Sequence, residues 1–197
     1  MKSSDQKIII YLLFSFAFLL FSCDSKSQIK AGKNNKMMYG TKQYVLSKGI
    51  EEVFKLDDNH SSSRINITDG DFYHTQVTIS GNLHWIWRAK NASVWLYVNM
   101  YSPGNGGLKD GLYVYKPRNT NENDPTLADT YFFKKGKIAI DLNNDGELES
   151  DNNEFIKIIG GTIKMKVLGD NYFLEFDLEL DNDINVTGSF EGYFNQV

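Results

Sequence analysis

The sequence predicts an all-β domain, an antiparallel β-sandwich or β-barrel that ends in a three-stranded meander. From Tyr39 onward, short runs of alternating apolar and polar residues are divided by turn clusters, and no run has a convincing helical period. The chain has three prolines and sixteen glycines, so its turns must rely mainly on Gly, Asn and Asp. The 175 residues that follow the N-terminal segment suit one domain.

Residues 1–22 have the character of a targeting segment. Two lysines precede an apolar run of fourteen residues, which is too short to span a bilayer comfortably as a helix. The segment leads into Leu20-Phe21-Ser22-Cys23, which resembles the lipobox of bacterial lipoproteins. The resemblance implies that the peptide is cut before Cys23 and that the Cys23 thiol carries a diacylglycerol. Cys23 is the only cysteine, which suits lipidation better than a structural role. The alternative is an ordinary secreted protein with a chance cysteine near its cleavage site.

The segment that follows the signal peptide predicts a tether and a location. Residues 23–38 are mostly polar and predict a flexible tether, so the single all-β domain should cover 39–197. Several acyl chains hold a protein to a membrane where one alone would be marginal. We therefore expect a lipid-anchored protein of the cell envelope, at the outer membrane, with the membrane as a partner. Without residues 1–22 the chain keeps 19 basic and 24 acidic residues, a net charge of −5 that argues against nucleic acid.

The body of the chain is predicted to form short strands. Polar turn clusters at 57–63, 69–71 and 118–125 separate alternating runs that are rich in strand-forming residues. The predicted strands before the meander cover 42–46, 52–56, 64–68, 72–79, two strands within 83–101, 111–115, 131–133 and 137–140.

Aromatic side chains gather within residues 83–101. Trp85 and Trp87 share one face of a predicted strand, and Trp95 and Tyr97 share one face of the next. A turn centred on Asn91 would place Trp87 opposite Trp95 and Trp85 opposite Tyr97, as one cross-strand ladder. The other face of the second strand is an apolar stripe that suits the core. The ladder is therefore either an outward-facing platform for a sugar or another ring-bearing ligand, or packing between two buried faces.

The stretch 141–154 contains D-x-N-x-D-G, the front half of a calcium loop. The candidate metal ligands are Asp141, Asn143 and Asp145 through side-chain oxygens, Glu147 through its carbonyl, and Glu149 through a water. Asn152 stands where the bidentate Glu is expected, so Glu154 or Asp151 would have to complete the site. The flanking segments alternate like strands, so this is not a helix-loop-helix hand. The stretch predicts either a calcium loop between strands, with calcium as the cofactor, or a plain acidic turn.

The last part of the chain predicts the meander, over 162–167, 172–180 and 184–194. Its natural register places Met165 opposite Leu174 and Leu174 opposite Phe190, so the apolar side chains of both hairpins share one face. The opposite face of the middle strand carries acidic residues at 175, 177 and 179, which we expect to be solvated and close to lysines at 164 and 166.

Three stretches together resemble a known group of proteins. They are Gly-x-Tyr-x-Tyr at 111–115, the strand at 161–167, and the ending Val186-Thr187-Gly188-Ser189-Phe190-Glu191-Gly192. With the lipobox, they are similar to a broad group of small, mostly uncharacterised lipoproteins of Bacteroidota-type bacteria. The resemblance implies a β-sandwich or calycin-like β-barrel outside the cytoplasm, and it carries over no catalytic residue.

The chemistry-bearing motifs of common enzymes are missing from the sequence. The three histidines, at 60, 74 and 84, have no metal-ligand spacing, and there is no G-x-S-x-G, no phosphate loop and no nucleophilic cysteine. We therefore expect a non-catalytic domain that binds a glycan or a protein at the cell envelope, and not an enzyme. Two alternatives stay open. One is a structural subunit of a surface assembly, and the other is a glycosidase-like hydrolase, which only the abundance of carboxylates supports.

Overall fold

The computed structural model describes residues 35–56, 59–148 and 154–196, all within one compact unit, Gly32–Val197. The predicted signal peptide, Cys23 and most of the predicted tether lie outside these residues, as does Glu149. In the described part of the chain, no helix is long and apolar enough to cross a membrane.

The fold is all-β, as the sequence predicts. The described residues form twelve strands and one short 3₁₀ helix, η1. The strands are β1 (Lys36–Tyr39), β2 (Lys42–Val45), β3 (Lys48–Leu56), β4 (His60–Thr68), β5 (Asp71–Ile79), β6 (Asn82–Lys90), β7 (Val94–Pro103), β8 (Gly111–Tyr115), β9 (Phe132–Ile140), β10 (Phe155–Leu168), β11 (Asn171–Leu180) and β12 (Asn185–Gln196), and η1 is Pro125–Leu127 between β8 and β9.

Several boundaries differ from the sequence prediction. β4 begins at His60, inside the turn cluster predicted at 57–63, because residues 60–63 pair with β7, and β3 begins at Lys48, ahead of the predicted start at 52, because it pairs with β4 from there. β1 begins at Lys36, inside the segment that was predicted as tether, because it pairs with β12 and β2. β9 runs without a break where two strands were predicted. Lys135 takes a positive φ of 57° there, and the register with β7 shifts between Tyr97 and Asn99. The strand absorbs this irregularity as a bulge, so no turn is needed.

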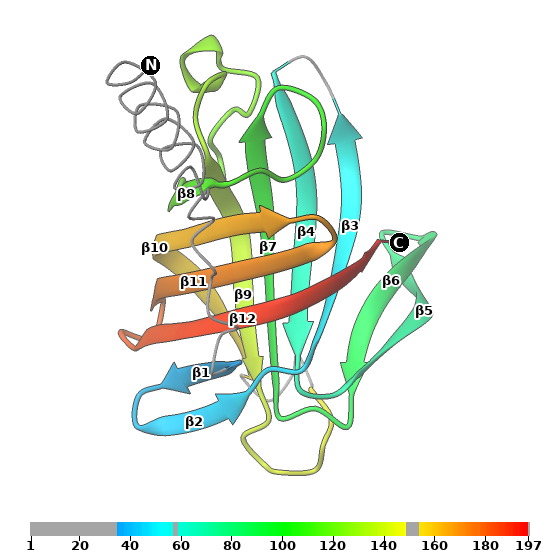
Figure 1. Ribbon diagram of the computed structural model, residues 1–197. Coiled ribbons are helices and arrows are strands. Elements are labelled where there is room, and N and C mark those ends of the chain that lie inside the picture. Colours follow the sequence, from blue (N-terminus) through cyan, green and yellow to red (C-terminus); the bar gives the residue numbers. More distant parts are fainter. Residues whose placement is uncertain (1–34, 57–58, 149–153, 197) are drawn as a thin grey trace, which may run out of the picture. The chain divides into compact units, whose positions relative to one another are not determined.

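The strand pairings close into a circuit. The neighbours follow the order β3–β4–β7–β9–β10–β11–β12 and return to β3, where β12 pairs in parallel through residues 194–196. The other pairs of the circuit are antiparallel. β10, β11 and β12 cross in front of β4, β7 and β9 (Figure 1). This barrel-like arrangement belongs to the fold class predicted from the sequence.

The main core fills the space inside this circuit. The predicted apolar stripe of β7, at residues 94, 96, 98 and 100, is buried there with apolar side chains of β4, β9, β10, β11 and β12. The predicted meander register is confirmed: Met165 pairs with Leu174, and Leu174 pairs with Phe190. The acidic row on β11 is exposed, and Lys164 Nζ lies 3.7 Å from Glu175 Oε2. Burial of apolar area is the main stabilising term for such a core.

A buried carboxylate marks the seam where the circuit closes. Glu51 of β3 is 1% exposed, and its oxygens accept hydrogen bonds from Ser63 Oγ at 2.6 Å, Tyr172 Oη at 3.1 Å and Gln196 Nε2 at 3.4 Å. Burial, together with the neighbouring Glu51 charge, raises the pKa of Tyr172 to about 12. The phenol therefore remains a donor throughout the ordinary pH range, and one carboxylate ties β3 to β4, β11 and β12.

The predicted aromatic ladder is not formed. β6 pairs with β5 in a separate two-stranded sheet, so Trp87 lies opposite His74, while Trp95 of β7 lies opposite Thr68 of β4. Both edges of β7 are occupied, by β4 and β9, because its apolar stripe must face the core. β6 therefore cannot pair with β7.

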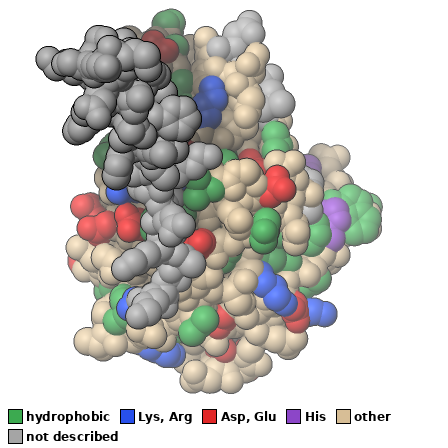
Figure 2. Space-filling model, in the orientation of Figure 1, with side chains coloured by type: hydrophobic (Ala, Val, Ile, Leu, Met, Phe, Trp, Pro, Cys, Tyr) green, Lys and Arg blue, Asp and Glu red, His purple; other side chains and the backbone are tan. Residues whose placement is uncertain are grey.

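The β5–β6 hairpin carries an exposed apolar surface. Leu83 and Trp85, which are 68% and 60% exposed, lie on one face of the hairpin, and Ile79, which is 51% exposed, lies on the other. Hydrophobic and histidine side chains gather over this hairpin, at the right of the space-filling view (Figure 2).

Candidate functional site

An open groove runs along the outer face of β3, β4, β7 and β9. On β4, Ile65 and Ile67 lie in the core, so the alternate residues Arg64 and Asn66 face outward. Three adjoining hollows, of about 300, 260 and 360 Å³, lie on this face, and Arg64 lines all three. Each is close to the lower limit of about 300 Å³ for a small-molecule pocket, so a ligand that uses them all must be extended.

We call the three hollows together the arginine groove, because the only three arginines of the chain, Arg64, Arg88 and Arg118, all line it. Its aromatic and amide lining is Phe54, Asn66, Trp87, Trp95, Tyr97, Asn99, Tyr101, Tyr115, Asn123 and Phe155.

Hydrogen bonds join the floor of the groove into one network. The Arg64 guanidinium donates to Asn99 Oδ1 at 3.2 Å and lies 3.4 Å from Glu52 Oε2. Asn66 Nδ2 donates to the other Glu52 oxygen at 2.8 Å, and Trp95 Nε1 donates to Asn66 Oδ1 at 3.2 Å. Each of these groups restrains the next, so the floor presents polar atoms in fixed directions before any ligand arrives.

The four aromatic residues that the sequence singled out take three different positions. Trp87 and Tyr97 are half-buried and line the groove. Trp95 lines the same hollow but is only 9% exposed. Trp85 is exposed on the hairpin, with His74 between it and Trp87, and the His74 ring centroid is 4.8 Å from each indole. The structure thus brings Trp87, Trp95 and Tyr97 together without the ladder, and leaves Trp85 outside the groove.

Trp95 belongs to a second, smaller core outside the main one. Its ring packs edge-to-face on Phe155, with centroids 5.9 Å apart, and lies 5.8 Å from the Tyr97 ring. The buried members of this second core are Ala89, Ala92, Trp95, Ala139 and Leu148. Trp95 is thus buried, as the packing interpretation of the sequence expects, and it also lines a hollow of the groove.

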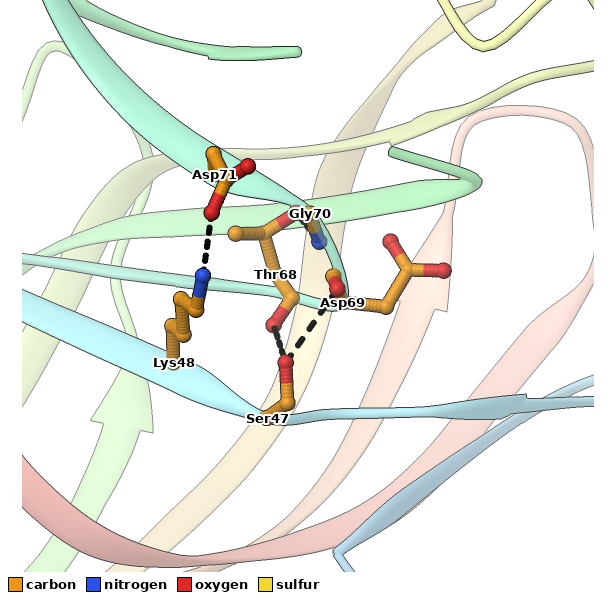
Figure 3. Close-up of polar contacts among 6 residues, drawn as sticks. All are labelled: Ser47, Lys48, Thr68, Asp69, Gly70 and Asp71. Carbon is orange, nitrogen blue, oxygen red and sulfur yellow. Dashed lines mark hydrogen bonds and ion pairs between the residues drawn. The ribbon is translucent and has the colours of Figure 1, made fainter. Parts of the chain in front are cut away.

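One wall of the groove is the β5–β6 hairpin, and its base is fastened to β3 (Figure 3). Ser47 Oγ lies 3.4 Å from the Thr68 carbonyl oxygen and 3.2 Å from the Asp69 carbonyl oxygen. Lys48 forms an ion pair with Asp71, and this hydrogen bond lowers the pKa of the Asp71 carboxyl. These contacts join the start of β3 to the turn between β4 and β5, where the hairpin begins.

The same base is packed tightly at Gly70. A Cβ at this position would lie 2.4 Å from the Lys90 carbonyl oxygen, which is closer than real Cβ atoms approach. Asp69 Oδ1 accepts the backbone N–H groups of Ser93 and Val94 at 2.9 and 3.1 Å. The start and the end of the hairpin are thus held against each other and against the start of β7.

At the other end of the groove, a buried lysine holds the loop between β8 and β9. Lys134 is 1% exposed, pairs with Glu122, and donates to the Thr120 carbonyl oxygen at 2.9 Å. Its hydrogen bond lowers the pKa of the Glu122 carboxyl. Tyr101 stacks on Phe132 with ring centroids 4.6 Å apart, and burial raises the pKa of Tyr101 to about 12.

The acidic loop is built from side chains that accept backbone N–H groups. The two oxygens of buried Asp141 accept from the N–H groups three and five residues on, at 2.6 and 2.9 Å. Asn143 and Asp145 each accept from the N–H two residues on, at 3.1 and 2.9 Å. Buried Glu154 accepts from the N–H of Leu142 at 3.1 Å, while the side chain of Glu147 is exposed.

These contacts are those of an acidic turn. Among the residues that the structure describes, no group of three His, Cys, Asp or Glu side chains is arranged to hold a metal ion, and Glu149 is not among them. Calcium binding by this loop stays a prediction.

The fold and the site together define a class, an all-β domain with an open groove lined by arginine and aromatic side chains. Comparison with models of protein families and with curated proteins finds no match, and comparison with solved structures finds none either. The resemblance to small lipoproteins therefore stays a prediction.

Sequence reasoning missed the arginines. They lie at positions 64, 88 and 118, on β4, on β6 and after β8, and only the folded chain brings them to one groove. The one available signal was their rarity, because the chain has 21 lysine and arginine residues and only three are arginine.

Proposed function

We propose that this protein is a lipid-anchored, non-catalytic binding protein of the cell envelope, and that it binds a glycan in the arginine groove. One observation carries the proposal. The half-buried rings of Trp87 and Tyr97 stand beside a polar floor in which Glu52 and Asn99 line the hollows. Buried Asn66 donates to Glu52, and Arg64 donates to Asn99, so both acceptors are held in place.

A sugar ring suits such a surface because it has both an apolar face and a rim of hydroxyl groups. Aromatic side chains cover apolar surface with a rigid plane, and a few well-placed polar groups then fix the orientation of the ligand. Each hydroxyl both donates and accepts, so a floor that mixes a carboxylate, amides and a guanidinium offers partners for both. The row of hollows suits an oligosaccharide better than one sugar.

The charge state of the groove supports binding without catalysis. A glycosidase of the common type needs one carboxylic acid that stays protonated near neutral pH, which requires a raised pKa. Of the two carboxylates that line the groove, Glu122 has its pKa lowered by Lys134, and Glu52 is paired with Arg64. Glu122 is therefore suited to remain ionised, and an oxygen of Glu52 already faces the Arg64 guanidinium at 3.4 Å.

The location in the envelope rests on the lipobox resemblance at Cys23. Lipidation there would hold the domain at a membrane surface and leave the groove free to meet extracellular or periplasmic glycans. A structural subunit of a surface assembly is the second candidate. The observation in its favour is the exposed apolar surface of the β5–β6 hairpin, with Leu83 and Trp85, which would be covered by a neighbouring subunit.

The test is glycan binding by the full-length chain in mild detergent. An array of neutral and acidic oligosaccharides, followed by calorimetry on the hits, should give a ligand. Trp87→Ala should weaken binding by about tenfold or more, because loss of a well-placed aromatic contact costs about 2 kcal/mol. The matched control is Tyr193→Ala, since Tyr193 is a 64% exposed aromatic residue of β12 that does not line the groove.

Three results would contradict the proposal. Equal binding by the Trp87→Ala variant, with an unchanged melting temperature, would place the ligand elsewhere. Release of reducing sugar from a bound glycan would indicate the hydrolase. Absence of any glycan ligand, together with a defined oligomer that Trp85→Ala dissociates, would favour the structural subunit.

A further inference from the structure

The arginine groove has an excess of positive charge in a chain that is negative overall. Six cationic side chains line its three hollows, against two carboxylates, so the local excess is four positive charges. The whole chain carries a formal net charge of −4. The cationic residues are Arg64, Arg88, Arg118, Lys135, Lys137 and Lys157.

Among the described residues, most of these cations have no carboxylate partner, and Lys137 lies over the Phe155 ring, with its Nζ 5.8 Å from the ring centroid. Arg64 pairs with Glu52, and Lys157 Nζ lies 3.8 Å from Asp181 Oδ2. Glu122 forms its ion pair with Lys134, which does not line the groove, so this carboxylate neutralises none of the six cations. Within the described residues, the four remaining cations, Arg88, Arg118, Lys135 and Lys137, have no ion pair.

We propose that the ligand of the arginine groove is an acidic oligosaccharide, with carboxylate or sulfate groups on its rings. This inference rests on the proposed function and adds the chemical class of the glycan. Arg88 and Arg118 would hold the anionic groups, and Trp87 and Tyr97 would cover the faces of the rings between them. Arg64 would stay in the floor network and orient the chain.

Arginine is suited to this role for a specific reason. Its planar guanidinium presents donors in a rigid fork that matches the two oxygens of a carboxylate or a sulfate, whereas a lysine offers a point charge. The arginines also come from separate elements. Arg88 is on the hairpin wall, and Arg118 is in the loop after β8, close enough for its charge to act on the pKa of Tyr97. Anionic groups at intervals along a chain of rings would meet both.

The same lining disfavours the other common polyanion, single-stranded nucleic acid. Such sites combine stacking rings with a cationic track that follows a phosphate at every residue. Here the two unpaired arginines border a floor that holds the Glu52 carboxylate and the amides of Asn66 and Asn99. Glu52 and Asn99 can pair with the hydroxyl groups of a sugar, whereas the backbone of single-stranded DNA has no hydroxyl group along its length to offer them.

Three saccharides of equal length and one nucleic acid form the test. Hexagalacturonate offers carboxylates, a heparin-derived hexasaccharide offers sulfates, and maltohexaose is neutral, while a short oligothymidylate stands for nucleic acid. Calorimetry with the full-length chain should show that one of the acidic hexasaccharides binds more tightly than maltohexaose and oligothymidylate. Its binding should weaken as NaCl rises from about 50 to about 500 mM, because salt screens exposed charges.

Variants then test whether Arg118 binds an anionic group of the ligand. Arg118→Gln should weaken binding of the acidic hexasaccharide by about tenfold, which is the scale of one charge-assisted hydrogen bond. Arg118→Lys should recover only part of the loss, because the charge returns without the fork. Lys42→Gln removes another exposed cation, on β2 and outside the groove, and should leave binding unchanged. Arg118 and Lys42 are both exposed, so neither variant should disturb folding.

The outcomes separate this inference from the proposed function. If maltohexaose binds as tightly as the acidic saccharides, the charge inference is wrong and glycan binding stands. If oligothymidylate binds as tightly, or Lys42→Gln weakens binding as much as Arg118→Gln, the groove has no specific acidic-sugar site. If no saccharide binds at all, both proposals fall.

Discussion

Replacement of Trp95 by alanine tests the division of the aromatic residues into packing and binding. The Trp95 indole is 9% exposed and lies in the second core, against Phe155 and Tyr97 and beneath the base of the β5–β6 hairpin. Its Nε1 donates to Asn66 Oδ1 at 3.2 Å. The alanine variant would leave a cavity in place of the ring and would remove a donor from the groove floor.

The expected cost follows from these contacts. A buried aromatic side chain covers about 150–250 Å², which at about 25 cal/mol per Å² is about 4–6 kcal/mol, an upper estimate because the unfolded chain is already partly collapsed. Large-to-small changes at buried aromatic positions cost about 3–5 kcal/mol. We therefore expect Trp95→Ala to lower the free energy of unfolding by about 3–5 kcal/mol. Trp95→Phe, which keeps much of the ring and loses the hydrogen bond, should cost about 1–2 kcal/mol.

Urea denaturation followed by circular dichroism measures these differences. The matched control is Trp85→Ala, because Trp85 is 60% exposed and its loss should change stability by no more than about 0.5 kcal/mol. If Trp95→Ala costs less than about 1 kcal/mol, the second core is not packed as described. Trp95 would then be part of an exposed binding platform, and the assignment of roles within the arginine groove would have to be reversed.

Three further changes test other parts of the molecule. Cys23→Ser should abolish lipidation and release the protein from membranes, and an unmodified Cys23 in an intact-mass spectrum of the native protein would rule the anchor out. Gly70→Ala should cost about 1–3 kcal/mol by overpacking against Lys90, and it should weaken ligand binding because the hairpin wall moves; thermal melts and calorimetry measure both. Calcium at millimolar concentration should raise the melting temperature if the acidic loop binds it, since binding only to the folded state stabilises that state. Asp145→Ala should remove that rise while barely changing the calcium-free melt, because Asp145 is exposed; no response at about 10 mM calcium would leave the loop as a turn only.

Local patterns predicted the meander well, for a physical reason. β10, β11 and β12 follow one another through tight turns, and each alternates with a period of two, so a register slip would expose the whole apolar face. Met165, Leu174 and Phe190 could therefore be paired correctly from the sequence.

Long-range competition defeated the prediction of the ladder. The strands of Trp87 and Trp95 are neighbours in sequence, and pairing them was the local choice. β7 instead pairs with β4 and β9, which complete the core around its apolar stripe. The sequence therefore identified the aromatic residues that line the groove, but it did not predict which strands pair with theirs.

The arginine groove could not be predicted from the sequence, because it too depends on long-range contacts. Arg64, Arg88 and Arg118 have no shared motif or spacing, and their meeting depends on the position of the hairpin and of the loop after β8. Sequence patterns indicate the two faces of a strand, but they do not show which elements fold over the outer face.

The seam between β12 and β3 has a consequence for the order in which the chain folds. Gln196 and Glu51 are 145 positions apart, so their contact forms only after the intervening strands have assembled, and contacts of such long range make folding slow. Until closure, β3 and β12 both offer an open edge to other chains. Glu51 makes a wrong register at this last step costly. Ser63 of β4 would still donate, but a β12 strand that docked on β3 one residue out of register would displace the donors Tyr172 and Gln196 from the buried carboxylate, at a cost that apolar contacts alone would not impose. The seam therefore forms slowly, and the buried Glu51 carboxylate specifies the register in which β12 pairs with β3.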